Sequence, residues 1–124
     1  MILGLGIDVA SIERMSQVLE RHGDRLWTRV LTPLEQATLA KRRDRAVALA
    51  GRWAAKEAAV KAFLGRAGAL WHDFEVRRGV LGEPEIHFLG RAALVADRLG
   101  VVRSLVSITH DAGVAAAVVV LEGP

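Results

Sequence analysis

Residues 45–64 are rich in alanine, contain no proline and have Gly51 as their only weak helix former. This composition predicts a long helix, around which the rest of a 124-residue chain must pack. At 3.6 residues per turn, Arg52 and Lys56 fall on one side of this helix and most apolar side chains on the other. The apolar side consists of Leu49, Ala50, Trp53, Ala54, Ala58, Val60 and Leu64. We expect that side to face the core.

Glu57 and Lys61 interrupt the apolar side, because their positions on the helix fall between those of Leu64 and Ala54. A glutamate four residues before a lysine stabilises an exposed helix by only about 0.3 to 0.5 kcal/mol, so the pair alone means little. On an apolar side, however, both charges would be desolvated at a considerable cost. The helix therefore leaves two interpretations open, a polar cavity that receives a ligand or metal ion, and a buried structural ion pair.

The amino-terminal part of the chain predicts a strand followed by two helices. Residues 2–9 are typical of a buried strand that ends near Asp8. Ser11 is a suitable N-cap for a helix that stops at Gly23. The apolar stripe of that helix is Ile12, Met15 and Leu19. Thr32 caps a second helix to about residue 43, with Pro33 at its first position and Glu35 three residues after the cap.

The carboxyl-terminal half predicts mostly strands. The expected elements are a hairpin of residues 73–78 and 84–88, a short helix at 91–99, and strands at 103–110 and 114–121 joined by a turn at 111–113. Together these elements predict one α+β domain, residues 1–124, in which a mainly antiparallel sheet packs against the long helix and the shorter helices.

Composition excludes several classes of protein. The chain has no cysteine, so disulfides, thiolate metal sites and cysteine nucleophiles are excluded, and a reducing cytoplasmic compartment is expected. The amino terminus has no basic segment and meets Asp8 early, so neither a signal peptide nor a membrane anchor is expected. Because 52% of the residues are apolar in so short a chain, some apolar surface should remain for partner subunits.

Asp8 favours the ligand interpretation of Glu57 and Lys61. A carboxylate directly after a buried strand lies at the end of a sheet, where clefts form. Mg²⁺ prefers one or two protein carboxylates together with waters and phosphate oxygens, and lysine neutralises phosphate as a point charge. Two carboxylates and an amine therefore suit phosphoryl-type chemistry.

Four segments in the chain carry a family resemblance. They are Gly6-Ile7-Asp8 followed by Ile12 and Arg14, residues 51–58 (GRWAAKEA) followed by Lys61-Ala62, Gly82 with Pro84, and Ser107-Ile108-Thr109-His110. In this order and at this spacing they closely resemble the holo-acyl-carrier-protein synthases, the short bacterial class of 4′-phosphopantetheinyl transferases. The resemblance covers nearly the whole chain.

The resemblance implies a reaction and its catalytic residues. A serine hydroxyl of an apo acyl carrier protein attacks the β-phosphate of coenzyme A, and 3′,5′-ADP leaves. The resemblance further implies Mg²⁺ held by Asp8, Glu57 and the coenzyme pyrophosphate, with Lys61 near the transferred phosphate. The serine proton could pass to Glu57 through water, to a metal-bound water or to a deprotonated Lys61. A homotrimer with active sites at subunit interfaces is also implied.

The coenzyme contacts implied by the resemblance are Lys61, Gly82, Pro84, Thr109 and His110. We add two arginines as candidates. Arg43 belongs to a basic cluster suited to a 3′-phosphate, although a basic run at the end of a helix is more often just a favourable terminal charge. Arg52 matches a family motif position but projects away from Glu57, so it would act at a subunit boundary or not at all. Residues 64–71 depart from the Gly-Thr-Gly run that many family members carry.

The carrier-binding prediction rests on charge. Eight of the seventeen basic residues lie between Arg14 and Arg45. Arg14, Arg21 and Arg25 share one helical face with Val18 between the first two, a surface suited to an acidic carrier protein, or simply a solvated helix face.

Two other classes of function remain as alternatives. The basic charge is compatible with a nucleic-acid-binding domain, although the chain has few aromatics and no motif for it. The carboxylates and lysine would equally serve a Mg²⁺-dependent phosphohydrolase with water as nucleophile. Neither a nucleic acid nor a membrane is expected as a partner.

Overall fold

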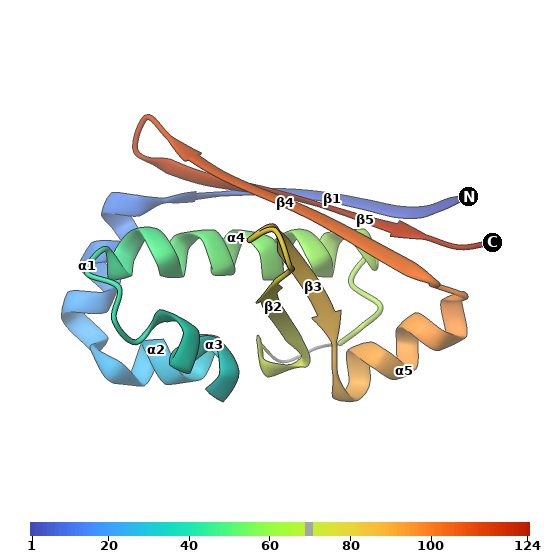
Figure 1. Cartoon of the computed structure of the whole chain (residues 1–124), viewed down its shortest axis with the longest axis horizontal. Coiled ribbons are helices and arrows are strands. Elements are labelled where there is room, and N and C mark those ends of the chain that lie inside the picture. Colours follow the sequence, from blue (N-terminus) through green and yellow to red (C-terminus); the bar gives the residue numbers. More distant parts are fainter. Residues whose placement is uncertain (69–70) are drawn as a thin grey trace.

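The computed structural model describes residues 1–68 and 71–124, and its elements follow one another as shown in Figure 1. The elements are β1 (Ile2–Ser11), α1 (Ile12–His22), α2 (Asp24–Val30), α3 (Pro33–Leu39), α4 (Arg45–Ala62), the 3₁₀ helix η1 (Trp71–Asp73), β2 (Phe74–Arg78), β3 (Pro84–Phe88), α5 (Gly90–Leu99), β4 (Arg103–Asp111) and β5 (Val114–Glu122). The predicted α+β class is confirmed, and α2 is an addition to the predicted elements. Residues 69–70 of the divergent 64–71 segment lie outside the described part. Within that part, none of the helices is both long and apolar enough to cross a membrane.

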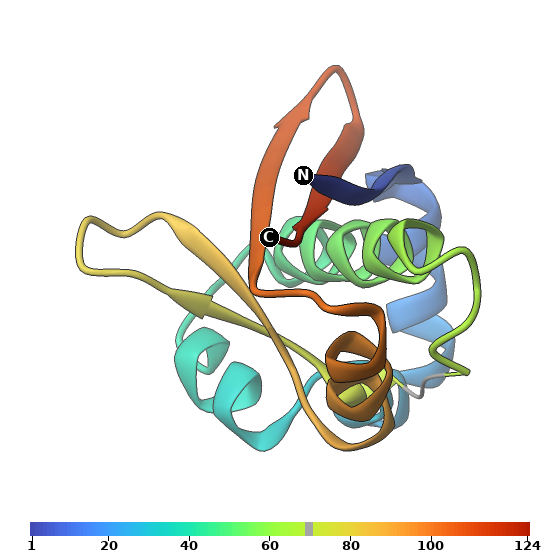
Figure 2. The ribbon, with the colours of Figure 1, turned by 90° about the vertical axis from the view of Figure 1, so that its right-hand side faces the viewer.

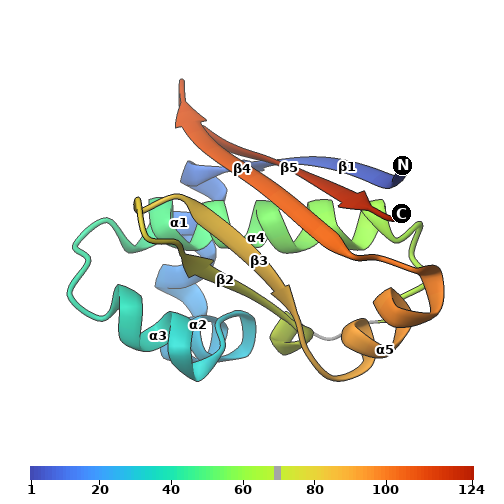
Figure 3. The ribbon, with the colours of Figure 1, turned by 45° about the vertical axis from the view of Figure 1, so that its right-hand side comes forward.

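Two antiparallel sheets lie on different sides of α4 (Figure 1). The larger sheet has the order β1-β5-β4, so β1 and β4 are its edges and β5 its centre. The hairpin β2–β3 forms the second sheet, and Figure 2 shows its tip projecting away from the body. Strand β3 runs beside β4 (Figure 3), where the Ser104 hydroxyl donates a 3.0 Å hydrogen bond to the Ile86 carbonyl.

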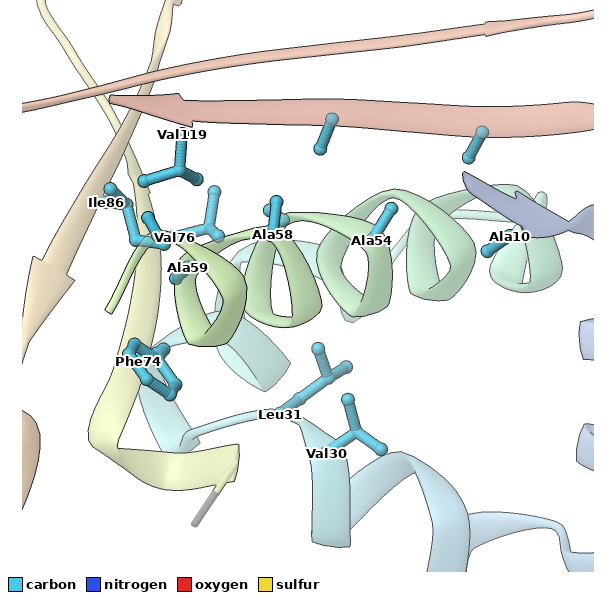
Figure 4. Close-up of a cluster of buried hydrophobic side chains, with 14 of the residues drawn as sticks. Ala10, Val30, Leu31, Ala54, Ala58, Ala59, Phe74, Val76, Ile86 and Val119 are labelled. Atoms are coloured by element: carbon cyan, nitrogen blue, oxygen red, sulfur yellow. The ribbon is translucent and has the colours of Figure 1, made fainter. Parts of the chain in front are cut away.

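The alanines of α4 form the centre of the core. Ala54 and Ala58 are fully buried, and Figure 4 shows α4 between Val119 of β5 on one side and Leu31 on the other. Small side chains let a helix and a sheet approach closely, and the larger apolar groups around them contribute about 1.5 to 3 kcal/mol each when fully buried. The helix is thus covered on more than one side.

This double coverage overturns the predicted polar side of the helix. Lys56 is fully buried and Arg52 is partly buried, because β2 packs against this side of α4 and the Lys56 ammonium bonds the Val30 carbonyl at the end of α2 and Glu35 of α3. Leu64, which we expected in the core, is 71% exposed because it follows the end of α4 with a left-handed φ of 55°. Trp53 and Val60 pack against the core as expected.

The prediction that residues 2–9 form a buried strand is correct for the strand and wrong for one of its faces. Leu5, Ile7 and Val9 are 63%, 63% and 59% exposed in the single chain. Side chains alternate along a strand, and only the face that carries Gly4 and Gly6 meets α4. The outer face of this edge strand is therefore apolar and uncovered.

Helix caps follow the prediction, whereas one helix end does not. Ser11 accepts a 3.1 Å bond from the Arg14 amide, and Thr32 with Glu35 forms a capping box, features that stabilise helices by about 1 kcal/mol. The helix that begins at Pro33 ends at Leu39 rather than near residue 43. Arg42 instead turns toward Asp44, donating two 2.6 Å hydrogen bonds that lower the pKa of this carboxyl to about 2.

Candidate active site

Asp8 is held against α4 by the glycines that precede it in β1. A Cβ atom on Gly6 would collide with the Ala58 carbonyl, and one on Gly4 with the Ala62 carbonyl. Because both positions lack side chains, β1 lies directly on the helix. Asp8 follows on the same face of the strand, opposite Ala117 of β5. The glycines thus set the distance between Asp8 and the polar residues of α4.

Lys61 completes a contact across this junction. Its ammonium donates a hydrogen bond of 2.8 Å to Oδ1 of Asp8 and one of 3.1 Å to the Ile7 carbonyl. The Asp8 side chain is 17% exposed and that of Lys61 is 54% exposed. The ion pair therefore lies at an open edge of the molecule, where a ligand can reach it.

Glu57 lies one helical turn before Lys61, and the charges of Asp8 and Lys61 both act on its carboxyl group. Partial burial raises the pKa of the Glu57 carboxyl, the negative charge of Asp8 raises it further, and Lys61 opposes these effects. The contribution of Asp8, although smaller than that of burial, is a repulsion between the two carboxylates. A cation bound between them would relieve that repulsion.

The donor set of this site fits a hard cation. Within residues 1–68 and 71–124, no group of three or more histidine, aspartate or glutamate side chains could hold a metal ion. Asp8 and Glu57 could supply two carboxylate ligands, the number with which Mg²⁺ is commonly bound when substrate phosphates and waters complete its coordination. The residues present fit Mg²⁺ in the company of a phosphate-bearing substrate.

The structure excludes one of the two interpretations of the charged pair on α4, the buried structural ion pair. Glu57 is half-buried and Lys61 is exposed, so these charges line an open site rather than a desolvated ion pair. The buried structural pair of this helix is a different one, formed by the Lys56 ammonium and Oε1 of Glu35 at 2.6 Å. The expected desolvation of both charges is therefore wrong, and a ligand site at Glu57 and Lys61 stays a prediction.

A second cluster lies on the opposite flank of α4. Three of the predicted coenzyme contacts, Arg52, Gly82 and Pro84, line one depression of about 210 Å³. Its other lining residues are Arg77, Arg78 and Ile108. We call this depression the arginine pocket. Sequence reasoning missed Arg77 and Arg78, although two consecutive arginines that end a predicted strand just before a glycine turn were a usable signal.

Electrostatics make the arginine pocket suited to an anion. Burial lowers the pKa of Arg52, and the neighbouring cations Arg78 and Arg42 lower it further, while Glu35 opposes them. The Nε atom of Arg52 is buried and has no hydrogen-bond partner among the described residues. Clustered guanidinium groups of this kind bind phosphate through several charge-assisted hydrogen bonds.

The remaining predicted coenzyme contacts are placed differently. Thr109 points to the outer face of the larger sheet, in one row with Ala116 and Val9. His110 is exposed and close enough to Asp44 to contribute to the low pKa of that carboxyl. Arg43 is exposed in a different depression, lined also by Ser16 and Glu20, so the structure does not bring it into the arginine pocket.

The two clusters face away from each other within one chain. Glu57 and Lys61 follow Arg52 by five and nine residues, which corresponds to about 140° and 180° of rotation around the helix. Asp8 lies in the edge strand β1, whereas Ile108 of the arginine pocket lies in the opposite edge strand β4. The two clusters therefore lie on different flanks of α4 in a single chain.

The predicted basic stripe is divided between two helices. Helix α1 ends at His22, so Arg25 belongs to α2 and does not share a helical face with Arg14. Two adjoining depressions nevertheless meet at Val18 and Leu26. One, of about 280 Å³, is lined by Val9, Ala10, Ser11, Arg14, Met15, Val18, Leu26 and Trp53. The other, of about 410 Å³, is lined by Val18, His22, Arg25, Leu26 and Arg29. Arg21 is exposed and lines neither.

We call this pair of depressions the basic groove. It begins at Val9, directly after Asp8, and continues along α1 and α2. Its floor is apolar and three arginines lie along it. Arg29 and Leu26 were missed by sequence reasoning because α2 was not predicted.

Comparison with known proteins gives a consistent result. The model of the family described as ACPS, 4′-phosphopantetheinyl transferase superfamily, matches residues 4–119. The chain is 48% identical to a holo-[acyl-carrier-protein] synthase of Anaeromyxobacter sp. strain K, over 99% of this chain and 98% of the relative.

Solved structures agree with these matches. The holo-[acyl-carrier-protein] synthase of Helicobacter pylori in complex with coenzyme A superimposes with a TM-score of 0.81 at 29% identity, covering 95% of this chain and 99% of that one. The Plasmodium yoelii acyl carrier protein synthase with ADP bound gives a TM-score of 0.90 at 26% identity, covering 100% and 97%. By sequence and by fold, the chain belongs to the 4′-phosphopantetheinyl transferase superfamily.

Proposed function

We propose that this chain transfers the 4′-phosphopantetheine group from coenzyme A to a serine of an apo acyl carrier protein, releasing 3′,5′-ADP. The observation that carries the proposal is the meeting of Asp8, Glu57 and Lys61 at an open junction between β1 and α4, in a chain of this family. Relatives of the chain are named holo-[acyl-carrier-protein] synthases, and one solved relative holds coenzyme A.

The reaction exchanges one oxygen–phosphorus bond for another. The serine oxygen of the carrier forms a bond to the β-phosphorus of coenzyme A, the bridging pyrophosphate bond breaks, and the electron pair leaves with 3′,5′-ADP. Catalysis of phosphoryl-type transfer depends mainly on positioning and charge neutralisation. Mg²⁺, with Asp8 and Glu57 as its protein ligands, would neutralise the charge of the coenzyme pyrophosphate and hold it in line.

Lys61 acts as an electrostatic group. Its ammonium is fixed by Asp8 and the Ile7 carbonyl, and roughly half of the side chain is exposed toward the open site. An amine held beside a carboxylate is better suited to neutralising phosphate than to accepting a proton. Lys61 would therefore contact the oxygens of the transferred phosphate.

Glu57 is the residue best suited to take the serine proton. Partial burial and Asp8 raise the pKa of Glu57 in the metal-free site, and a bound cation would lower it again, so the assignment rests on the place of Glu57 beside the proposed metal site. Because a metal ligand has one oxygen directed at the cation, we place a water molecule between Glu57 and the serine hydroxyl. Glu57 would accept the proton through that water as the oxygen–phosphorus bond forms.

The active form is proposed to be a homotrimer. Leu5, Ile7 and Val9 of β1 and Leu105 of β4 expose an apolar surface on the outer face of the larger sheet, a surface of a kind that usually marks an interface. Thr109, a proposed coenzyme contact, lies on this same face. The number three comes from the family resemblance, and light scattering of the purified protein tests it.

An active site between two subunits follows from the separation of the two clusters. Within one chain the carboxylate site and the arginine pocket lie on opposite flanks of α4, so one coenzyme would contact the carboxylate site of one subunit and the arginine pocket of its neighbour. Arg52, Gly82 and Pro84 would then bind the coenzyme from the second subunit, together with His110. Arg43 remains a weaker candidate, because it lies outside this pocket.

The basic groove is proposed to bind the carrier protein. Its arginines suit an acidic partner and its apolar floor suits inserted aliphatic side chains. The groove starts beside Asp8, so a carrier bound there would have its serine near the carboxylate site. Arg14, Val18 and Arg25 are retained in this role, and Arg21 would contribute long-range charge.

One experiment tests the function directly. The purified protein is incubated with coenzyme A, Mg²⁺ and an apo acyl carrier protein, and the carrier is weighed by mass spectrometry. We expect the carrier to gain one phosphopantetheine group and 3′,5′-ADP to appear in equal amount. An unmodified carrier with hydrolysed coenzyme would instead indicate a phosphohydrolase.

A further inference from the structure

Arg77 lines the arginine pocket, and its orientation is fixed by a carboxylate of the same strand. Its Nε donates a hydrogen bond of 2.7 Å to Oε1 of Glu75. Residues two apart on a strand point to the same side, so β2 itself brings the pair together. Arginine carries five N–H donors and this bond uses one. Among the described residues, no hydrogen bond uses the four donors on the terminal nitrogens of Arg77, which remain for a ligand.

Glu75 is itself held firmly. It is only 6% exposed, and its second oxygen, Oε2, accepts a 2.7 Å hydrogen bond from the hydroxyl of Thr32. Thr32 is the buried N-cap of α3. Glu75 therefore has one oxygen anchored in the interior of the protein and the other directed at Arg77.

The anchor continues into a buried network. The Thr32 amide donates to Oε1 of Glu35 at 2.8 Å, and the fully buried Lys56 ammonium donates to the same oxygen at 2.6 Å. The other Glu35 oxygen accepts from the Val76 amide at 2.9 Å. This network joins α3, α4 and β2, so Glu75 cannot follow a moving arginine side chain without breaking buried hydrogen bonds.

The negative charge of Glu75 opposes the binding of an anion in the arginine pocket. Burial raises the pKa of its carboxyl, but the hydrogen bonds from Thr32 and Arg77 and the nearby charges of Arg77 and Lys56 outweigh this effect, and the net pKa is lowered. An ionised carboxylate thus lies beside a pocket whose arginines suit an anion. By Coulomb's law alone it weakens anion binding there, so its contribution must come from geometry.

We propose that Glu75 is a positioning residue that fixes the Arg77 guanidinium, so that its terminal nitrogens bind a phosphate group of coenzyme A in the arginine pocket. The identity of the anion rests on the proposed function. The planar guanidinium group of arginine can donate two parallel hydrogen bonds to two phosphate oxygens. A guanidinium already held through its Nε loses less conformational entropy when the phosphate binds.

Charge and geometry predict opposite signs for one measurement. The dissociation constant of coenzyme A is measured by calorimetry for the assembled parent protein and for Glu75→Ala. Loss of a negative charge alone would tighten binding, whereas loss of the Arg77 orientation should weaken it about tenfold, a change of the size expected for one hydrogen bond to a charged group. Tighter or unchanged binding by Glu75→Ala would overturn the proposal.

A double-variant cycle shows whether Glu75 acts through Arg77. We expect Arg77→Ala to weaken coenzyme binding, and Glu75→Ala/Arg77→Ala to bind no more weakly than Arg77→Ala alone. An additional loss in the double variant would show that Glu75 acts by another route and would overturn the proposal.

A third variant does not disturb the buried network. Arg77→Lys keeps the positive charge at a side chain that is 38% exposed. Its single ammonium cannot bond Glu75 and at the same time donate two parallel hydrogen bonds to a phosphate. We expect about tenfold weaker coenzyme binding with an unchanged melting temperature, and this holds even if Glu75→Ala fails to fold. The matched control is Arg103→Lys, since Arg103 also bonds a glutamate through Nε, Glu122 at 2.9 Å, outside the arginine pocket.

The outcomes separate this inference from the function on which it rests. A parent protein that does not bind coenzyme A would overturn both. Binding by the parent, with Arg77→Lys as tight as the parent and as Arg103→Lys, would overturn the positioning role alone.

Discussion

The ammonium of Lys61 lies 2.8 Å from Oδ1 of Asp8, across the junction between α4 and β1. This ion pair connects the central helix to the edge strand and uses one oxygen, Oδ1, of the Asp8 carboxylate. A bound cation would therefore share the Asp8 carboxylate with Lys61. Lys61 would then lie close to the phosphate that accompanies the metal.

Asp8→Asn should abolish transfer while the fold persists. The amide keeps the shape of the side chain but loses the negative charge that both Lys61 and a divalent cation require. We expect activity with apo carrier to fall by at least about a hundredfold, the usual scale for loss of a metal ligand in an active site. Circular dichroism and the melting temperature should remain close to those of the parent.

Glu57→Ala and removal of metal by EDTA provide the comparison for Asp8→Asn. Both should give the same loss of transfer, and excess Mg²⁺ should restore only the EDTA-treated parent. Near-full turnover of either carboxylate variant in Mg²⁺ would contradict the metal assignment.

Glu57→Gln should stabilise the protein at neutral pH. The pKa of Glu57 is raised in the folded state, so the ionised carboxylate destabilises the fold above that pKa, and the cost disappears below the unfolded value near 4.5. We expect the variant to melt at a higher temperature than the parent at pH 7 to 8, and the difference to shrink toward pH 4. The exposed Glu20→Gln is the control for loss of a charge, and an equal gain in both variants would contradict the argument.

Sequence reasoning raised Asp8, Glu57 and Lys61 as candidates from local patterns alone. Glu57 and Lys61 interrupt an apolar helical side, and Asp8 was expected near the end of a strand, whereas β1 continues past it to Ser11. The element types followed for the same reason, since caps at Ser11 and Thr32 and the turn at 111–113 are local signals.

The arginine pocket and the buried network depend on which elements meet in space. Lys56 looked like a solvated residue on the helical wheel, and only the packing of α3 shows that Glu35 lies against it. A lysine buried without such a partner would be very costly, so the pair has to be read from tertiary structure. The exposed face of β1 was not predicted, because an apolar strand pattern does not show which face of the strand the rest of the chain covers.

Gly6→Ala should destabilise the contact between β1 and α4 that places Asp8 beside Lys61. A methyl group at this position would collide with the Ala58 carbonyl of α4, and backbone cannot move aside as a side chain can. We expect a loss of about 1 to 3 kcal/mol in the free energy of unfolding, as overpacked cores show, with reduced transfer because Asp8 shifts from Lys61. Urea denaturation with the transfer assay measures both effects.

Gly51→Ala is the matched control. A Cβ there would lie 3.3 Å from a methyl group of Ile108, a side chain that can adjust, and alanine favours the helix over glycine by about 1 kcal/mol. We expect its stability to stay within about 1 kcal/mol of the parent. Equal damage by the two substitutions would argue against close approach of β1 and α4 as the reason for Gly6.

Arg14→Glu should impair the carrier and spare the coenzyme. Arg14 is exposed at the edge of the basic groove, so reversing its charge should raise the KM for an acidic carrier about tenfold while the KM for coenzyme A is unchanged. Added salt should reduce the difference, because exposed charges are screened over roughly 8 to 10 Å. The control is Arg98→Glu, the same change on α5. A KM for carrier that ignores both charge reversal and salt would move the docking surface elsewhere.

Subunit mixing should restore activity to two inactive variants. If the carboxylate site of one subunit works with the arginine pocket of its neighbour, Asp8→Ala and Arg52→Ala damage different sides of each interface. Trimers reassembled from equal amounts of the two variants should then contain intact sites at about one interface in four, because the contact in a closed ring joins two different surfaces. Transfer activity near that fraction of the parent is expected, whereas each variant alone should remain inactive.

Mixing Asp8→Ala with Glu57→Ala is the control, since both substitutions lie on the same side of the interface and no mixed interface would be complete. Activity that stays absent in the first mixture, although light scattering shows that subunits have exchanged, would place the whole site within one chain.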